Sequence, residues 1–175
     1  MRCEDQTIIK REPRTSLRPS AAVEPEVLGR AVSDRPSSVT QAVRAAVRAI
    51  HQGALRPVAR RDAGMAYEPQ TLLALVSYCY ARDIYGSADI EDVLRRDSVF
   101  RQLCQNEFPG ARIIRRFRRE NRETLHCCLT SVLRAVAAPM ESGRGVELNE
   151  DELSEEASRR IMKAVFIDSM AEDDD

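Results

Sequence analysis

Residues 69–81 read PQTLLALVSYCYA, a segment that is mostly apolar. Pro69 suits the first turn of an α-helix, where a missing backbone N–H costs nothing. Apolar side chains then recur on nearly every side of the helix, so other elements must surround it. We therefore expect this helix to be the buried centre of a domain. Its inward residues are predicted to be Leu72, Leu73, Leu75, Val76, Cys79 and Tyr80.

Short amphipathic helices are predicted on both sides of this centre. Before it, an apolar helical period begins near Ser38, and Gly53 can close that helix. After it, Ser87 and Asp97 stand where the caps of two further short helices are expected. No segment of four residues alternates between apolar and polar side chains as a strand does. The chain is therefore predicted to be all-α, a small helical bundle.

The longest predicted helix runs from Ala111 to about Ala138 and has one apolar face. A last helix, residues 150–170, begins with Asn149 and Glu152 at the spacing of a capping box. The inward residues expected are Ile113, Ile114, Phe117, Thr124, Leu125, Cys128 and Val132 in the first helix, and Leu153, Ala157, Ile161, Ala164 and Val165 in the second.

The first 37 residues differ in composition from the rest. Four prolines lie among Arg, Ser and Glu, and no apolar period is sustained, which predicts a disordered arm. The chain divides accordingly into the arm (1–37), a helix with a linker (38–66), a helical domain (67–138), and a loop with an acidic helix and tail (139–175).

The length of 175 residues is enough for one domain with tails. The longest aliphatic run is Leu72–Val76, whereas a membrane-spanning helix needs roughly 20 apolar residues. The amino-terminal sequence MRCEDQTIIKREPR lacks the apolar segment of a secretory signal. A cytoplasmic protein without membrane contact is expected.

Charge is distributed unevenly along the chain. Residues 1–146 carry 24 basic and 17 acidic side chains, whereas residues 147–175 carry 3 basic and 11 acidic. A basic body with an acidic tail leaves nucleic acid open as a partner. The basic residues are 25 arginines and 2 lysines, a bias that a GC-rich coding sequence can also produce. Two roles are open for the acidic segment: it shields the basic surface, or its helix packs on the core.

The start of the longest helix is the densest basic segment. Residues 111–122 read ARIIRRFRRENR, and a helical wheel places Arg112, Arg116 and Arg119 opposite Phe117. Two more arginines lie beside this group and one lies on its flank. Arginine carries a permanent charge on a planar fork that fits phosphates and the edge of guanine. The candidate DNA-binding residues are Arg112, Arg115, Arg116, Arg118, Arg119 and Arg122.

A short helix, a turn of about five residues and this basic helix have the outline of a helix-turn-helix unit. Two other interpretations stay open, a solvated helix face and a surface for an acidic protein partner. A solvated helix usually places Glu four residues from Arg, whereas Glu120 alone accompanies six arginines here. This imbalance favours nucleic-acid contact.

Neither catalysis, a metal nor a cofactor is predicted from the residues. His51 and His126 are the two histidines, and neither suggests a Ser-His-Asp or Cys-His arrangement. A zinc site from Cys79, Cys104, Cys127 and Cys128 is conceivable, but no Cys-x-x-Cys spacing supports it, and buried free thiols are favoured. The carboxylates expected at helix caps and outer faces, rather than at a metal, are Asp83, Asp89, Glu91, Asp92 and Asp97.

Several motifs occur in order along residues 67–138: Tyr-x-Pro with leucines, Tyr-x-Tyr, Ile-Glu, Asp-x-x-Phe-Arg and Arg-Phe-Arg. This order resembles the amino-terminal helical domain of insertion-sequence transposases of the DDE type. The resemblance implies a helical DNA-binding domain, accessory to DNA transposition or a remnant of it. The motif residues are Tyr67, Pro69, Leu72, Leu73, Tyr78, Tyr80, Ile90, Glu91, Asp97, Phe100, Arg101, Arg116, Phe117 and Arg118.

The chain also departs from that family. Gly110 stands where the family has an Asp that caps the Arg-Phe-Arg helix, and Asn121 stands where it often has His. The family's catalytic domain, in which three carboxylates hold two metal ions, has no room after residue 138. We therefore expect binding to double-stranded DNA without catalysis by this chain alone.

Two alternatives to this expectation remain. The first is a protein-interaction module whose Arg-rich face binds an acidic partner. The second is an enzyme that acts together with a separate transposase catalytic chain.

Overall fold

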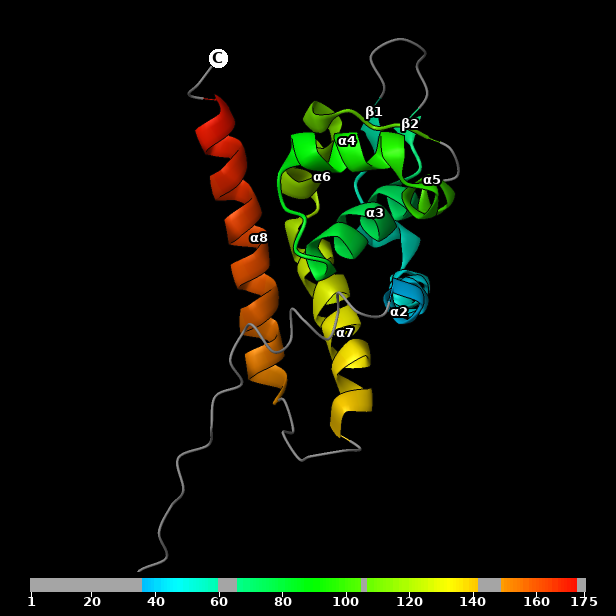
Figure 1. Cartoon of the computed structure of the whole chain (residues 1–175), viewed down its shortest axis with the longest axis vertical. Helices are drawn as coiled ribbons and strands as arrows, with labels where there is room; N and C mark the ends of the chain where they lie inside the picture. The colour runs from blue at the N-terminus through cyan, green and yellow to red at the C-terminus, as the bar shows by residue number, and fades with distance from the viewer. Residues whose placement is uncertain (1–35, 60–65, 105–106, 142–148, 173–175) are drawn as a thin grey trace, which may run out of the picture.

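The chain is all-α in the computed structural model, which describes residues 36–59, 66–104, 107–141 and 149–172 (Figure 1). Most of the predicted disordered arm lies outside these residues. Two-residue strands β1 (Val58–Ala59) and β2 (Ala66–Tyr67) pair antiparallel. The helices are α2 (Pro36–Ala49), the 3-10 helix η1 (Gln52–Ala54), α3 (Pro69–Ala81), α4 (Ser87–Arg96), α5 (Ser98–Leu103), α6 (Ala111–Glu120), α7 (Arg122–Glu141) and α8 (Glu150–Glu172).

The α3 helix lies at the centre of the molecule, as its sequence predicts. Every residue from Thr71 to Ala81 is buried. The helix packs against α2, α5, α6 and α7, and Tyr78 meets Phe100 of α5 edge to face with ring centroids 5.0 Å apart. Each side of this apolar helix therefore has a neighbour that removes it from water.

The end of α3 shows why the chain turns there. Asp83 has a φ of 62°, a left-handed conformation that Asp tolerates better than most residues. The Ile84 N–H donates to the carbonyl of Cys79 at 2.9 Å, and the Asp83 N–H donates to Tyr80 at 3.3 Å. These two bonds define a Schellman motif, which ends a helix and satisfies its last carbonyls.

The α8 helix holds the corner between α3 and α4. Buried Arg160 donates to the carbonyls of Tyr80 and Ala81 at the C-terminus of α3, at 2.6 and 3.1 Å. Asp168 accepts a 2.8 Å bond from the Ser87 N–H at the N-terminus of α4. A cation at a helix C-terminus and an anion at an N-terminus both complement the helix dipole. Ser87 was predicted to be the cap of α4, but Gly86 occupies that position and Asp168 supplies the acceptor.

The predicted long helix is divided at Asn121 into α6 and α7. Asn121 has a φ of −122°, outside the helical range, and its side chain is buried. Its Oδ1 accepts the Arg56 N–H at 2.6 Å, and its Nδ2 donates to the Arg56 carbonyl at 3.1 Å. The helix departs from ideal geometry because this side chain satisfies a backbone segment 65 residues away.

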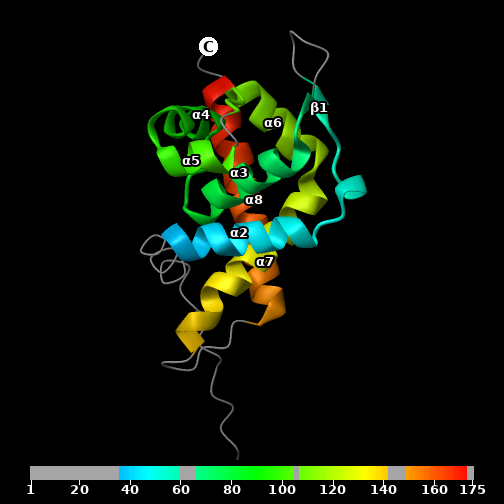
Figure 2. The ribbon, with the colours of Figure 1, turned by 90° about the vertical axis from the view of Figure 1, so that its right-hand side faces the viewer.

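The α2 helix crosses α7 and also contacts α3 (Figure 2). Its buried face contains Val39, Val43 and Val47. The helix ends at Ala49, earlier than the predicted stop at Gly53, because His51 begins a separate turn. His51 Nδ1 accepts the Gly53 N–H at 3.1 Å and so caps η1.

The hydrophobic core extends beyond the predicted domain of residues 67–138. One buried cluster joins the apolar faces of α2, α3, α7 and α8. The predicted inward residues of α8 are buried, except that Val165 is 42% exposed. Of the two roles open for the acidic segment, packing of its helix on the core is the one observed. Within the described residues, no helix combines the length and apolar composition that crossing a membrane requires.

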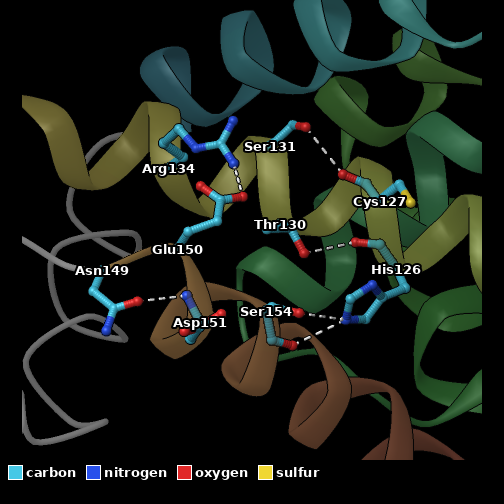
Figure 3. Close-up of polar contacts among 9 residues, drawn as sticks. All are labelled: His126, Cys127, Thr130, Ser131, Arg134, Asn149, Glu150, Asp151 and Ser154. Atoms are coloured by element: carbon cyan, nitrogen blue, oxygen red, sulfur yellow. Dashed lines mark hydrogen bonds and ion pairs between the residues drawn. The ribbon is translucent and has the colours of Figure 1, made fainter.

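The start of α8 has the predicted capping box. Asn149 Oδ1 accepts the Asp151 N–H at 2.6 Å, and Glu152 Oε2 accepts the Asn149 N–H at 3.2 Å. Figure 3 shows this end of α8 against α7, where Arg134 pairs with Glu150. The capping box was predictable because all of its bonds are local.

Candidate nucleic-acid interface

The α6 helix, which carries the basic segment, is attached at its N-terminus to α4. Gly110 is the N-cap position and offers no side-chain acceptor. Glu91 of α4 replaces it: its Oε2 accepts the Ala111 N–H at 2.7 Å, and its other oxygen pairs with Arg95. The capping acceptor that Gly110 lacks is therefore supplied by another helix. A carboxylate here also suits the helix dipole.

The packing of α6 differs from the helix-turn-helix outline expected from the sequence. The helix packs mainly on α4, with further contacts to α3, α7 and β1. The short helix α5, expected to be its partner, packs instead on α4 and α3. Ile114 and Phe117 are the fully buried apolar residues of α6, which leaves the opposite side of the helix to solvent.

Four of the six predicted arginines form the outer side of α6, which we call the Arg face. Arg112, Arg116 and Arg119 are exposed, and Arg115 is half-buried. Arg116 Nε donates to Glu120 Oε1 at 2.7 Å. Within the residues that the structure describes, neither Arg112 nor Arg119 has an ion-pair partner. With Glu120 as its one carboxylate, the Arg face has a net charge of +3.

Arg118 is not part of this face, in contrast to the prediction. It is 6% exposed, and its Nη2 donates to Asp168 Oδ2 at 2.7 Å. Its Nη1 donates to the hydroxyl of Tyr80 at 3.0 Å. The wheel placed Arg118 on the flank of the helix, and α8 covers that flank. Arg118 is therefore a buried structural residue, and its guanidinium is not available to contact DNA.

Tyr80, whose hydroxyl accepts the Arg118 bond, is itself buried. Burial raises the pKa of Tyr80 to about 12, although the Arg118 charge and hydrogen bond act in the opposite direction. Tyr80 therefore stays a neutral phenol at physiological pH. Its hydroxyl oxygen accepts the hydrogen bond from Arg118, and the role of Tyr80 is structural.

Arg122 lies beyond the division at Asn121, on the first turn of α7. Its side chain is exposed, and its Nη2 lies 3.2 Å from the sulfur of Met162 on α8. It is therefore directed to the α8 side of the molecule, apart from the Arg face. Of the six arginines predicted to bind DNA, the structure brings four together and separates Arg118 and Arg122 from them.

Among the described residues, the cysteines and carboxylates do not assemble into a metal site. Within the described part of the chain, no group of three or more His, Cys, Asp or Glu side chains is placed to hold a metal ion. Cys79, Cys104 and Cys128 are buried free thiols, whereas Cys127 is exposed. Burial raises the pKa of Cys128 to about 11 and that of Cys104 to about 12, so both thiols stay protonated.

Two of the predicted cap and surface carboxylates, Asp83 and Asp92, have ordinary structural partners. Asp92 pairs with Arg95 and Arg96 on the outer side of α4, and Asp83 Oδ1 accepts the Tyr85 hydroxyl at 2.6 Å. His126 Nε2 lies 2.9 Å from the carbonyl oxygen of Ser154, so its ring is directed towards α8 (Figure 3).

Comparisons with protein-family models, with curated proteins and with solved structures find no match to this chain.

Proposed function

We propose that the chain is a DNA-binding helical domain that contacts double-stranded DNA through the Arg face of α6. The observation that carries the proposal is the exposure of Arg112, Arg116 and Arg119 on one side of a helix. Two of these arginines have no carboxylate partner in the described residues, so their charge is available to phosphates. The attachment of α6 to α4 through Glu91 fixes the orientation of this face.

The resemblance to the amino-terminal domain of DDE-type transposases supports a role in DNA transposition. The chain would be an accessory to that process or a remnant of it, and a separate catalytic chain would supply strand cleavage and joining. This part of the proposal depends on the motifs in residues 67–138, whereas the DNA contact depends on the Arg face.

The experiment is a salt titration of duplex binding. Each neutralised phosphate contributes about 0.9 to the slope of log K against log salt. Replacing Arg112, Arg116 and Arg119 by Ala is therefore expected to flatten the slope by about 2.7. The matched control replaces three exposed arginines on α2 and α5, a change of equal charge: Arg44→Ala, Arg48→Ala and Arg101→Ala.

The control distinguishes local contact from a general effect of net charge. An equal loss of affinity in the two triple variants would contradict a contact through α6. The interaction-module alternative predicts that an acidic peptide binds the wild-type chain more tightly than duplex DNA does. A single substitution that alters sequence preference more than salt slope would identify a residue that reads a base edge.

A further inference from the structure

The outer side of α8 has an apolar surface that the core does not use. Five large hydrophobic side chains are exposed in the described residues, and four of them lie on this helix. Their spacing of i, i+3, i+4 and i+8 puts them on one side of α8, opposite its buried face. We call them the α8 stripe: Met162, Val165, Phe166 and Met170, with exposed fractions of 52%, 42%, 64% and 55%.

Contiguous exposed apolar side chains on a helix are typical of an interaction surface. Phe166 is the largest of the four and the most exposed. Aromatic and methionine side chains are also enriched at the centres of protein interfaces. The stripe therefore fits another apolar helix face, and the charges around it indicate which one.

Opposite charges lie at the two ends of the stripe. At its first end, exposed Arg122 contacts Met162 and has no carboxylate partner in the described residues. At its second end, the last turn of α8 contains no basic residue, and the helix ends at Glu172. The helix dipole disfavours acidic residues near a helix C-terminus. A cation from a second molecule would therefore stabilise this end of α8.

An antiparallel pair of α8 helices brings these opposite charges together. If the pair is centred between Val165 and Phe166, Met162 of one helix lies opposite Ser169 of the other. Arg122 then lies next to the acidic end of the second copy, and symmetry repeats this contact on the other side. A parallel pair would instead place the two acidic ends side by side, where they repel.

We propose that two copies of this chain associate through their α8 stripes in an antiparallel, two-fold arrangement, with Arg122 of each copy facing the acidic C-terminal end of the other. The proposal does not depend on DNA binding, because none of these residues belongs to the Arg face. A single pair of helices forms an interface at the small end of the known range, so the association is weak.

The first test is sedimentation of the full chain from about 1 μM to about 1 mM protein, where weak association is measurable. A reversible monomer–dimer equilibrium is expected. Phe166→Ser should weaken it about tenfold or more, as loss of a central aromatic residue does. The matched control is Phe108→Ser, which removes another exposed phenylalanine that lies outside α8, and this variant should leave the equilibrium unchanged. Circular dichroism of both variants verifies that each is folded.

The second test concerns orientation. Arg122→Glu should weaken the dimer, and adding Glu172→Lys should restore it. In a chain without Cys3 and Cys127, Val165→Cys should crosslink to its own copy, and Met162→Cys should crosslink to Ser169→Cys in a mixture. Crosslinking of Met162→Cys to itself would overturn the antiparallel arrangement.

A chain that stays monomeric at every concentration would overturn the proposal. A chain that becomes dimeric only after deletion of residues 1–35 would show that the arm covers the stripe. This result would also overturn the proposal. A dimer that Phe166→Ser leaves unchanged would place the contact elsewhere, with the same consequence. None of these results bears on the salt titration.

Discussion

Asp168 of α8 connects two other helices, α4 and α6, through its carboxylate. Its two oxygens accept the N–H and the hydroxyl of Ser87 at 2.8 and 2.5 Å, and one also accepts Arg118. Breaking a buried ion pair by removing one partner leaves an uncompensated charge, which costs about 3 to 5 kcal/mol. Asp168→Ala should therefore lower the free energy of unfolding by about that amount in urea denaturation.

The control for this prediction is Asp92→Ala, because Asp92 is also paired with arginine but is 58% exposed on its side chain. Exposed pairs contribute about 0 to 1 kcal/mol, so this variant should unfold almost like the wild-type chain. Similar losses in the two variants would mean that the Arg118 pair is not shielded from water.

The raised pKa of Tyr80 predicts that the folded chain loses stability at alkaline pH. Its pKa is raised from 10.0 to about 12, chiefly by burial. The unfolded chain therefore loses this proton first, and the free energy of unfolding should fall as pH rises through the window between about 10 and 12. The full effect of a two-unit shift is about 3 kcal/mol.

Urea denaturation at about pH 9 and about pH 11 measures this loss of stability. The fall should be smaller in Tyr80→Phe, which cannot ionise. Burial also raises the pKa of Tyr85, so the variant should keep part of the wild-type dependence. A fall of equal size in Tyr80→Phe would assign the whole effect to other groups.

At the scale of elements, the junction between α6 and α7 depends on Asn121. Replacing it by Ala leaves the part-buried Arg56 N–H without its acceptor, at a cost of about 1 kcal/mol, the low end of the range for buried groups. Ser131→Ala is a suitable control, because it removes an exposed side-chain bond within α7. Thermal melting of the two variants tests the prediction, and equal melting temperatures would contradict it.

The sequence predicted most helices because their signals are local. Pro69 marks the start of α3, and Asn149 with Glu152 marks the start of α8. It could not predict the division at Asn121 or the cap of α6 by Glu91, because each depends on a partner from a distant part of the chain. Arg118 was misplaced for the same reason: its partner Asp168 lies 50 residues away.

For the candidate site, the sequence predicted which helix would be basic and which side would face solvent. Arg112, Arg116 and Arg119 were placed opposite Phe117, and they are exposed. The wheel alone could not show which flank α8 would cover. The same is true of any helix that packs on elements far away in the sequence. Periodicity identifies the buried face of such a helix, but it does not identify the element that covers this face.

At the scale of the whole molecule, α8 is part of the core rather than a removable tail. Leu153, Ala157 and Ile161 are buried, and Arg160 and Asp168 hold the corner between α3 and α4. Deleting residues 149–175 should therefore abolish cooperative thermal unfolding, whereas deleting residues 1–35 should leave it intact. A truncated chain that melts cooperatively and binds DNA more tightly would instead favour the shielding role of the acidic segment.

The pair of Arg118 and Asp168 has a consequence for how this chain can evolve. Loss of either residue alone leaves a buried charge unpaired, so a lineage must pass through an unstable intermediate or exchange both positions at once. Arg118→Lys would not be a neutral step, since a lysine cannot reproduce the two bonds that the guanidinium makes to Tyr80 and Asp168. Descendants of this gene should therefore show coupled substitution at positions 118 and 168, while the arginines of the outer α6 surface drift independently of α8.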